Sequence, residues 1–189
     1  MRMIQALSRY LRLSLSKGND IVTVEDELEN VKSYLEIQQI RNRDLFSYKV
    51  ECQVDAAHTT VLKLVLQPLV ENAVKYGFQD IFEGGQIRIT VWKEEGELYL
   101  EVYNNGTPME ADMVQKINGM NKLPLGEMKN SFPDKRHGYG VVNILTRLRL
   151  KYGDGAAFYC KAQADGTTCT IKIPQGDGQE AYEQEQIQI

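Results

Sequence analysis

Three polar side chains lie together in an otherwise apolar segment near the middle of the chain. Glu71, Asn72 and Lys75 belong to the stretch LQPLVENAVKYG, residues 66–77. At about 100° per residue on a helix, they share one arc with Pro68 and leave an apolar face on the other side. One face of the helix is therefore apolar, and the other carries an acid, an amide and an amine in a row. A plain solvated face with an i,i+4 ion pair gives the same pattern, and this segment alone favours that bland interpretation.

Two further segments carry residues that could approach a phosphorylated ligand. One is VYNNGTP, residues 102–108, where a strand is expected to end in a tight polar turn. The other is HGYGVVN, residues 137–143, where Gly138 and Gly140 open a helix. Such a glycine pair lets backbone amides approach a phosphate at the positive end of the helix, although simple loop flexibility explains it equally well. An irregular segment precedes the pair, so it does not belong to a Rossmann βαβ unit.

The elements that must position these residues follow from the hydrophobic periodicity. Helical spacing predicts helices over residues 3–17, 24–44, 59–76, 109–120 and 139–152. Alternation predicts a strand over residues 45–54 and antiparallel hairpins over 86–105 and 156–174, turning at Glu94-Glu95-Gly96 and Asp165-Gly166. The order of these elements predicts an α+β fold, with a mixed, mostly antiparallel sheet and helices packed on one face.

The second predicted helix has a cap signal and an unusual apolar face. Thr23 followed by Asp26 predicts a capped N-terminus for that helix. Its apolar stripe is narrow, which favours pairing with another helix over burial in a deep core. Packing against the following domain is the alternative for the same stripe.

One long stretch carries no clear period. Residues 121–138 are rich in Gly, Pro, Lys and Asn, and such a stretch in a compact domain is more often a lid or binding loop than a spacer. We expect this lid to be mobile without a ligand, because it has few apolar anchors.

Composition sets the class of protein. The chain has 189 residues, 42% hydrophobic and 25% charged, as expected for one globular domain or one domain with an appendage. A net charge of -4 argues against nucleic-acid binding. Neither an apolar run of the roughly 20 residues needed to span a bilayer nor a signal peptide is apparent, so we expect a cytoplasmic location. Cys52, Cys160 and Cys169 are widely spaced, which favours free thiols in a reducing compartment.

In this order, the three polar segments resemble the N, G1 and G2 boxes of the GHKL ATPase superfamily. LQPLVENAVKYG resembles the N box of sensor histidine kinases. Together with GYGVVNILTRLRLKYG it is more narrowly similar to LytS/YesM-type kinases, whose usual forms are QPLVENAIKHG and GxGLxNxxxRLxxxYG. The leader YLRLSLSKGNDIVTVEDELENVKSYLEIQQIRNRD looks like the end of that family's dimerisation and phosphoacceptor region. The resemblance covers residues 1 to about 174.

The resemblance implies a fold and a division of the chain. The fold would be the two-layer α/β sandwich of histidine kinase ATPase domains, preceded by helices. Residues 1–44 would be the last helices of the dimerisation and phosphoacceptor region, and residues 45–174 the ATP-binding catalytic domain. Residues 175–189 form a polar, acidic tail that we expect to be disordered.

The resemblance also implies roles for the polar helix face, with ATP and Mg²⁺ as the cofactors. Asn72 would bind Mg²⁺ through its side-chain oxygen. Glu71 would be the polarising acid or water-orienting base, and Lys75 would face the phosphates. These residue types suffice because phosphoryl transfer depends mainly on positioning and charge neutralisation.

Other residues are implied to contact the nucleotide. Asn104 would hold the adenine amino group, and Gly106 would let its turn pass close to the base. The remaining implied contacts, including the glycines that let the lid fold over the triphosphate, are Tyr76, His137, Gly138, Tyr139 and Gly140.

Three positions depart from the family pattern. Asn104 stands where Asp is usual, which removes charge assistance and predicts adenine binding weaker by ~1 kcal/mol. Pro108 replaces the second glycine of that turn and stiffens it. Tyr76 replaces the usual His and is a poorer hydrogen-bond match.

The family's acceptor histidine lies in a Pro-His-Phe-x-x-Asn motif that this sequence lacks. Only His58, interpreted as a surface residue, and His137 are present. We therefore expect the catalytic domain of a two-component sensor histidine kinase that cannot autophosphorylate alone. It would transfer the γ-phosphoryl group to a histidine outside this fragment, for onward transfer to a response regulator.

The expected partners are the acceptor region of the full kinase, a response regulator and a second copy of the chain, with membrane attachment only through a preceding part. Two alternatives stay open. One is a GHKL serine kinase resembling anti-sigma factors, which the leader helices disfavour. The other is a degenerate, non-catalytic dimerisation module, which Asn104 and Pro108 make arguable and the intact polar helix face opposes.

Overall fold

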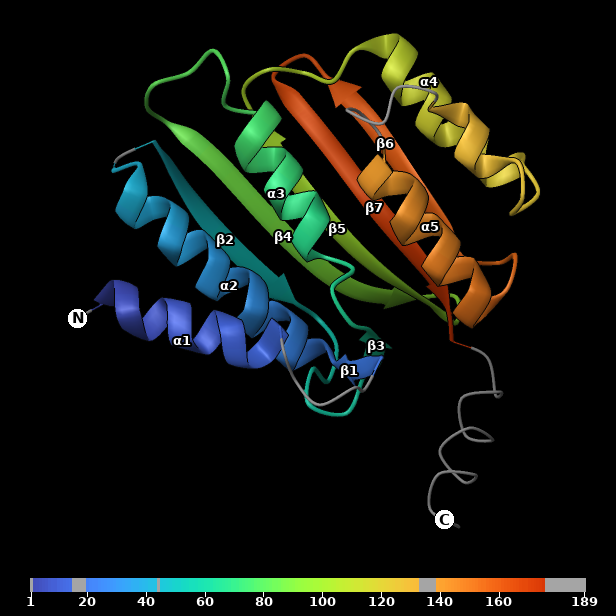
Figure 1. The fold of residues 1–189 in the computed structure, drawn as a ribbon, viewed down its shortest axis with the longest axis horizontal. Helices are drawn as coiled ribbons and strands as arrows, with labels where there is room; N and C mark the ends of the chain where they lie inside the picture. Colours follow the sequence, from blue (N-terminus) through green and yellow to red (C-terminus); the bar gives the residue numbers. More distant parts are fainter. Residues whose placement is uncertain (1, 15–19, 44, 133–138, 176–189) are drawn as a thin grey trace.

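A five-stranded mixed sheet organises the protein, seen in a computed structural model that describes residues 2–14, 20–43, 45–132 and 139–175 (Figure 1). Its strands follow the order β2-β4-β5-β7-β6. Their bounds are β2 Phe46–Cys52, β4 Gly85–Glu94, β5 Glu97–Asn105, β6 Ala157–Gln163 and β7 Gly166–Pro174. Strand β2 runs parallel to β4, and the other neighbours are antiparallel. A separate antiparallel pair joins β1 (Ile21–Thr23) and β3 (Thr60–Leu62).

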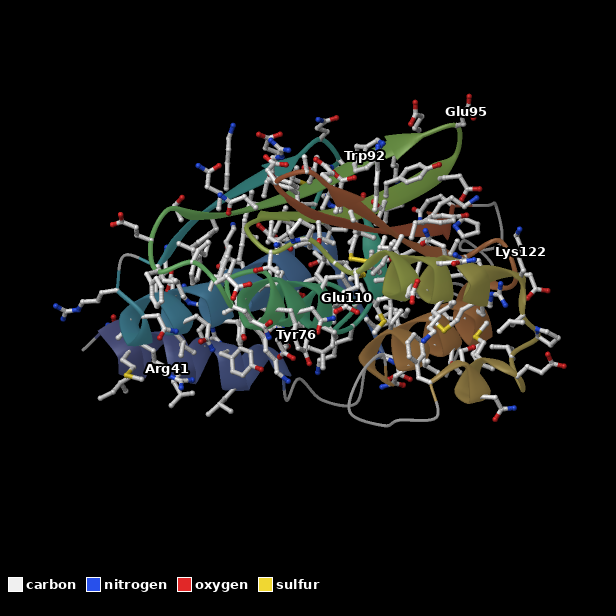
Figure 2. The ribbon with its side chains drawn as sticks, turned by 90° about the horizontal axis from the view of Figure 1, so that it is seen from above. Arg41, Tyr76, Trp92, Glu95, Glu110 and Lys122 are labelled. Atoms are coloured by element: carbon white, nitrogen blue, oxygen red, sulfur yellow. A yellow bond between two sulfur atoms is a disulfide. The ribbon has the colours of Figure 1, made fainter. Side chains whose placement is uncertain are left out.

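The helices pack on one face of this sheet (Figures 1 and 2). They are α1 Arg2–Ser14, α2 Val24–Arg41, α3 Gln67–Tyr76, α4 Ala111–Gly119 and α5 Tyr139–Tyr152, with short 3₁₀ turns η1 Met120–Lys122 and η2 Met128–Ser131. Figure 2 shows Trp92 on the opposite, open face, where its ring stacks on Tyr99 with centroids 5.0 Å apart. The α+β fold predicted from the sequence is confirmed, because apolar helix faces and one sheet face form a single core.

Helix α2 begins as its sequence predicts. The Thr23 hydroxyl accepts a hydrogen bond from the Asp26 amide, 3.1 Å away. The helix ends at Arg41 rather than near Asp44. We expected its apolar stripe to pair with another helix, but that expectation was wrong. Leu28, Val31 and Leu35 are buried in the main core. Helix α1 packs along α2 and leaves apolar side chains exposed, namely Met3, Ile4, Leu7 and Leu11.

The prediction of one helix over residues 59–76 was wrong in its first half. Thr60–Leu62 form strand β3, and α3 begins only at Gln67 with Pro68 in its first turn. Between them Leu64 has a φ of 58°, which a continuous helix does not allow. Pairing with β1 and the bonds of a distant carboxylate, described below, override the local helical pattern.

Both predicted hairpins are present. In the β4–β5 turn, Glu95 and Gly96 have φ values of 51° and 79°, as a type I′ turn requires. The β6–β7 turn comes one step earlier than predicted, at Ala164-Asp165, and Gly166 already belongs to β7. The backbone of Asn104 and Asn105 lies against Gly166 and leaves no room for a Cβ atom.

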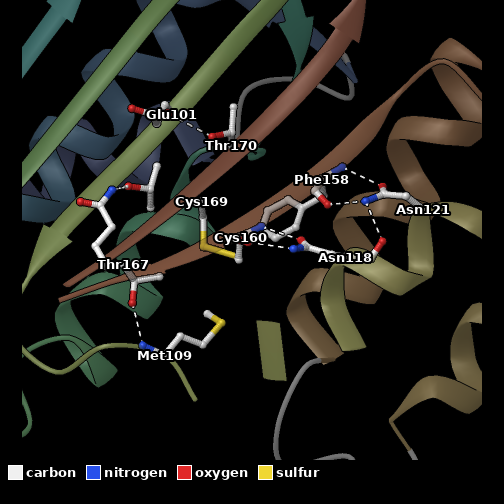
Figure 3. The surroundings of a disulfide bond; sticks show 11 residues. Glu101, Met109, Asn118, Asn121, Phe158, Cys160, Thr167, Cys169 and Thr170 are labelled. Carbon is white, nitrogen blue, oxygen red and sulfur yellow. Dashed lines mark hydrogen bonds between the residues drawn. A yellow bond between two sulfur atoms is a disulfide. The ribbon is translucent and has the colours of Figure 1, made fainter. Parts of the chain in front are cut away.

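The expectation of three free thiols was wrong for two of them. Cys160 and Cys169 form a disulfide across β6 and β7 (Figure 3), with Cα atoms 4.3 Å apart. The hairpin register places them directly opposite each other, which the sequence spacing alone did not reveal. Cys52 is free and exposed.

Several predicted segments lie outside the described residues. These are the end of the first helix (15–17), residues 133–138 of the lid, and 176–189 of the tail. The earlier part of the lid contains η1 and η2. Among the described residues, no helix combines the length and hydropathy needed to cross a membrane.

Candidate functional site

Helix α3 carries the polar face that the sequence singled out. Glu71 and Asn72 are half-buried, whereas Lys75 is exposed. The Glu71 carboxylate accepts a hydrogen bond of 2.6 Å from the Gln67 amide, and the Lys75 ammonium lies 4.8 Å from the centre of the Tyr76 ring. Within the described ranges no Glu71–Lys75 ion pair forms, so the bland interpretation of this face is not supported.

The Asn72 side chain makes no hydrogen bond to any residue that the structure describes. A half-buried amide with no partner in the described part of the chain is available to a ligand, since buried polar groups are normally paired. The described part of the chain contains no cluster of three or more His, Cys, Asp or Glu side chains suited to a metal ion. A cation here would therefore depend on Asn72 together with oxygens from a ligand.

The end of α3 meets the turn that follows β5. Gly106 has a φ of 102°, and a Cβ atom there would collide with the Gly77 carbonyl. That carbonyl accepts a 2.8 Å hydrogen bond from the Thr107 amide. Only glycine permits this close backbone approach. The structure thus joins the second predicted segment directly to the first.

Asn104 lies in the same junction and is only 5% exposed. Its side-chain nitrogen donates to the Asn105 carbonyl at 2.9 Å. That bond leaves the Asn104 side-chain oxygen as an acceptor without a partner among the described residues. This oxygen could accept a hydrogen bond from the amino group of a ligand.

Helix α5 brings in the third segment only in part. Figure 1 shows its N-terminal end at the same end of the molecule as the C-terminal ends of α3 and β5. Gly140 lies in its first turn, where a Cβ atom would meet nothing within 4 Å, so packing does not require glycine there. Tyr139 is the first residue of the helix, but its side chain, like His137 and Gly138, lies outside the described residues.

Sequence reasoning missed a polar clamp between α4, α5 and β6. The Asn118 amide exchanges two 2.9 Å hydrogen bonds with the backbone of Cys160, and Asn121 does the same with Phe158 at 2.7 and 3.0 Å (Figure 3). These amides occupy the free edge of β6 as a further strand would. Two asparagines three residues apart, at the end of a predicted helix and the start of the irregular stretch, were the only local signal.

Arg149 of α5 closes this clamp. The guanidinium is buried and donates to the Leu123 carbonyl at 2.6 Å and to the Asn121 carbonyl. The beginning of the predicted lid is therefore held to α5 by one charged side chain.

Sequence reasoning also missed Glu27, which is 1% exposed. Its two carboxylate oxygens accept 2.8 Å hydrogen bonds from the amides of Leu64 and Leu66, just before α3. Burial raises the pKa of Glu27, and these backbone bonds act in the opposite direction. Because Leu66 has no side-chain cap, Glu27 supplies from α2 the acceptor that the start of α3 needs.

Glu71 also acts on Tyr34 of helix α2. Burial, followed by the charge of Glu71, raises the pKa of Tyr34 to about 12. The Tyr34 ring lies 6.3 Å from that of Tyr10, centre to centre. The carboxylate of α3 therefore faces α1 and α2 at close range.

A cavity of about 320 Å³ lies elsewhere, between the leader helices and the turn before α3. Its lining residues are Arg12, Leu13, Val22, Asp26, Glu27, Asn30, Lys63 and Leu64. None of the predicted nucleotide contacts belongs to this set, so the cavity is not the site that the sequence predicts.

Two family models match the chain. The one described as "Histidine kinase-, DNA gyrase B-, and HSP90-like ATPase" matches residues 57–177, and the one described as "Histidine kinase" matches residues 1–46. The sensor protein kinase HptS of Staphylococcus aureus (strain USA300) is 30% identical over 176 residues, covering 93% of this chain and 32% of that protein. The chain spans about a third of the length of the curated relatives it matches.

Solved structures of histidine kinases share the fold. The nucleotide-free catalytic domain of ThkA superposes with a TM-score of 0.57 at 15% identity, covering 82% of this chain and 95% of that domain. The histidine kinase domain of the Erythrobacter litoralis EL346 blue-light activated kinase gives 0.55 at 18% identity, with coverages of 95% and 76%. ThkA in complex with the response regulator protein TrrA gives 0.56 at 16% identity, with coverages of 93% and 48%.

Proposed function

This chain belongs to the histidine kinase-, DNA gyrase B- and HSP90-like ATPase family as an ATP-binding catalytic domain of the histidine kinase type, and we propose that it transfers the γ-phosphoryl group of ATP to a histidine. The observation that carries this proposal is the half-buried Asn72 amide, which has no partner among the described residues and lies beside Glu71, on a helix whose end meets the Gly106 turn. The polar face of α3 would bind the phosphates of a nucleotide, and the adjoining Gly106 turn would bind its adenine.

The residues on α3 fit a magnesium nucleotide. Asn72 would hold Mg²⁺ with the phosphate oxygens, and the ion would neutralise phosphate charge during transfer. Glu71 would orient or accept the proton of the attacking group, and exposed Lys75 would approach the phosphates as a point charge.

The turn after β5 would recognise the base. The Asn104 side-chain oxygen would accept a hydrogen bond from the adenine amino group. Because Gly106 has no side chain, the adenine could lie close to the backbone of this turn. Tyr76 and the start of α5 with His137, Gly138, Tyr139 and Gly140 complete the proposed contacts. The positive end of α5 supports phosphate binding there.

The acceptor histidine would lie outside these residues. His58 is exposed and bonds to Asp55 at 3.0 Å, and neither His58 nor His137 stands in an acceptor motif. The proposed division is a leader of residues 1–44 from the dimerisation and phosphoacceptor region, a catalytic domain of residues 45–174 and a tail of residues 175–189. The proposed subclass is the LytS/YesM type.

The proposed partners are the acceptor region of the full kinase, a response regulator and a second copy of the chain. ThkA, of the same fold, is described in complex with a response regulator. The apolar side chains exposed on α1 support a homodimer formed through the leader. Such a domain would act on the cytoplasmic side of the membrane, with any attachment made by a preceding part.

Calorimetric titration with Mg-ATP and Mg-ADP tests the proposal. We expect binding in the micromolar-to-millimolar range that Asn72→Asp abolishes, because a second carboxylate beside Glu71 repels the phosphates and alters the cation ligand. Asn42→Asp, the same change at the exposed end of α2, should bind as the parent chain does. No binding by the parent chain would favour the degenerate dimerisation module, and phosphoserine on a partner protein would favour the serine kinase.

A further inference from the structure

The Gln67 side chain joins three helices. Its nitrogen donates to the Glu71 carboxylate at 2.6 Å on α3 and to the Tyr10 hydroxyl at 2.5 Å on α1. Its oxygen accepts from the Asn30 side-chain nitrogen on α2 at 2.9 Å. One amide group therefore touches both leader helices and the proposed catalytic acid.

These contacts use both N–H donors of the amide and one acceptor site of its carbonyl oxygen. A glutamine side chain offers two N–H donors, and here both are taken while its carbonyl serves Asn30. The opposite orientation would set the carbonyl oxygen against the Glu71 carboxylate and the NH₂ group against the Asn30 donor. Only one orientation satisfies all three helices, so a change at any one of them acts on the other two.

The junction is partly buried, with Gln67, Glu71 and Tyr10 all of intermediate exposure. Asn30 is 2% exposed, and the Tyr10 ring packs near that of Tyr34, whose hydroxyl responds to the charge of Glu71. A partly buried N–H donor that loses its acceptor is unfavourable. Loss of the Tyr10 hydroxyl should therefore disturb the Gln67 amide.

We propose that Gln67 is a positioning residue that ties the Glu71 carboxylate to the placement of helices α1 and α2. When α1 moves, the Tyr10 hydroxyl leaves Gln67, one N–H of the amide loses its acceptor, and the hydrogen bond from the other N–H to Glu71 changes in geometry. The assignment of Glu71 as the acid rests on the proposed function, whereas the coupling between α1 and Glu71 does not. In the kinase, the helices next to the acceptor region would thus set the orientation of the acid.

The direct test observes Glu71 while changing Tyr10. In the nucleotide-free chain, we expect Tyr10→Phe to shift the carboxylate carbon resonance of Glu71, although no bond joins the two residues. In the Gln67→Met background the same substitution should leave that resonance unmoved. The control Tyr159→Phe removes the hydroxyl of an exposed side chain on strand β6 and should have no effect in either background.

Denaturant unfolding of the variant set provides a second measurement. The effects of Tyr10→Phe and Glu71→Met on the unfolding equilibrium constant should be non-additive by about twofold or more with Gln67 present, and additive with Gln67→Met. An unmoved Glu71 resonance, or equal coupling in both backgrounds, would overturn the proposal. Neither measurement contains nucleotide, so a failure of ATP binding would contradict the proposed function and leave this coupling standing.

Discussion

The two sides of the candidate nucleotide site are built by different means. On the α3 side, backbone meets backbone: the Gly106 turn lies against the Gly77 carbonyl with no space for a side chain. On the α5 side, the start of the lid is held by the side chains of Asn118, Asn121 and Arg149. Backbone contact leaves the first side little freedom, whereas the second depends on side-chain hydrogen bonds together with the burial of Met120, Met128 and Phe132 in the core.

The largest effect expected is that of Gly106→Ala on the α3 side. The substitution combines an unfavourable φ with a collision against Gly77, so the free energy of unfolding should fall by about 2–4 kcal/mol. Gly96→Ala is the matched control, because Gly96 also has a positive φ but open space around it, and should cost about 1 kcal/mol. Equal losses in urea unfolding would show that the close backbone approach contributes nothing.

The next effect is that of Arg149→Met on the α5 side. It removes the donor to two carbonyls, and we expect a loss of about 2 kcal/mol in the free energy of unfolding. Hydrogen exchange should accelerate in residues 121–125 while α3 stays protected. Arg43→Met, an exposed arginine, is the control. Faster exchange in α3 to the same degree would mean that the two sides are not independent.

A smaller effect separates binding from stability at Asn104. Asn104→Asp restores the charged acceptor, and we expect nucleotide affinity to rise about fivefold, or ~1 kcal/mol. The same change replaces the donor to the Asn105 carbonyl with a carboxylate, so stability should fall by about 1 kcal/mol. Calorimetry of this variant tests the expected rise in nucleotide affinity, and urea unfolding tests the expected fall in stability. Weaker nucleotide binding would show that Asn104 does not contact the adenine.

The smallest effect is a pH dependence at the start of α3. Burial raises the pKa of Glu27 above its ordinary value of 4.5, so the folded chain binds this proton more tightly than the unfolded chain. Its contribution to stability is therefore full below that value and is lost as pH rises through the raised pKa. The stability of the parent chain relative to Glu27→Gln should fall as pH rises from about 4.5 in urea titrations. A relative stability that rises with pH would contradict the dominance of burial.

Much of the fold followed from local pattern. Strand alternation, the Glu95-Gly96 turn and the Thr23 cap were predictable because each depends on residues close in sequence. The prediction of a helix over residues 59–76 was wrong because the first part of this segment pairs with β1 and bonds to Glu27, both far away in the sequence. The disulfide was missed for a related reason, since it depends on hairpin register rather than on spacing.

The site likewise contains residues that local sequence pattern predicted and residues that it did not. The polar face of α3 and the Gly106 turn were predicted, and the structure brings them together. Gln67 and Arg149 were not singled out, because a glutamine or an arginine in an amphipathic helix carries no local sign of a distant partner. The roles assigned to all the site residues stay predictions, and His137, Gly138 and the Tyr139 side chain also lie outside the described residues.

The most direct test of the central claim is amide chemical-shift mapping with Mg-ADP. We predict the largest shifts at the Asn72 and Asn104 side-chain amides and at the backbone amide of Gly106, from the two elements that meet at Gly77. Shifts confined to the cavity between the leader helices and the turn before α3, or no shifts at millimolar nucleotide, would contradict a nucleotide site built on this face.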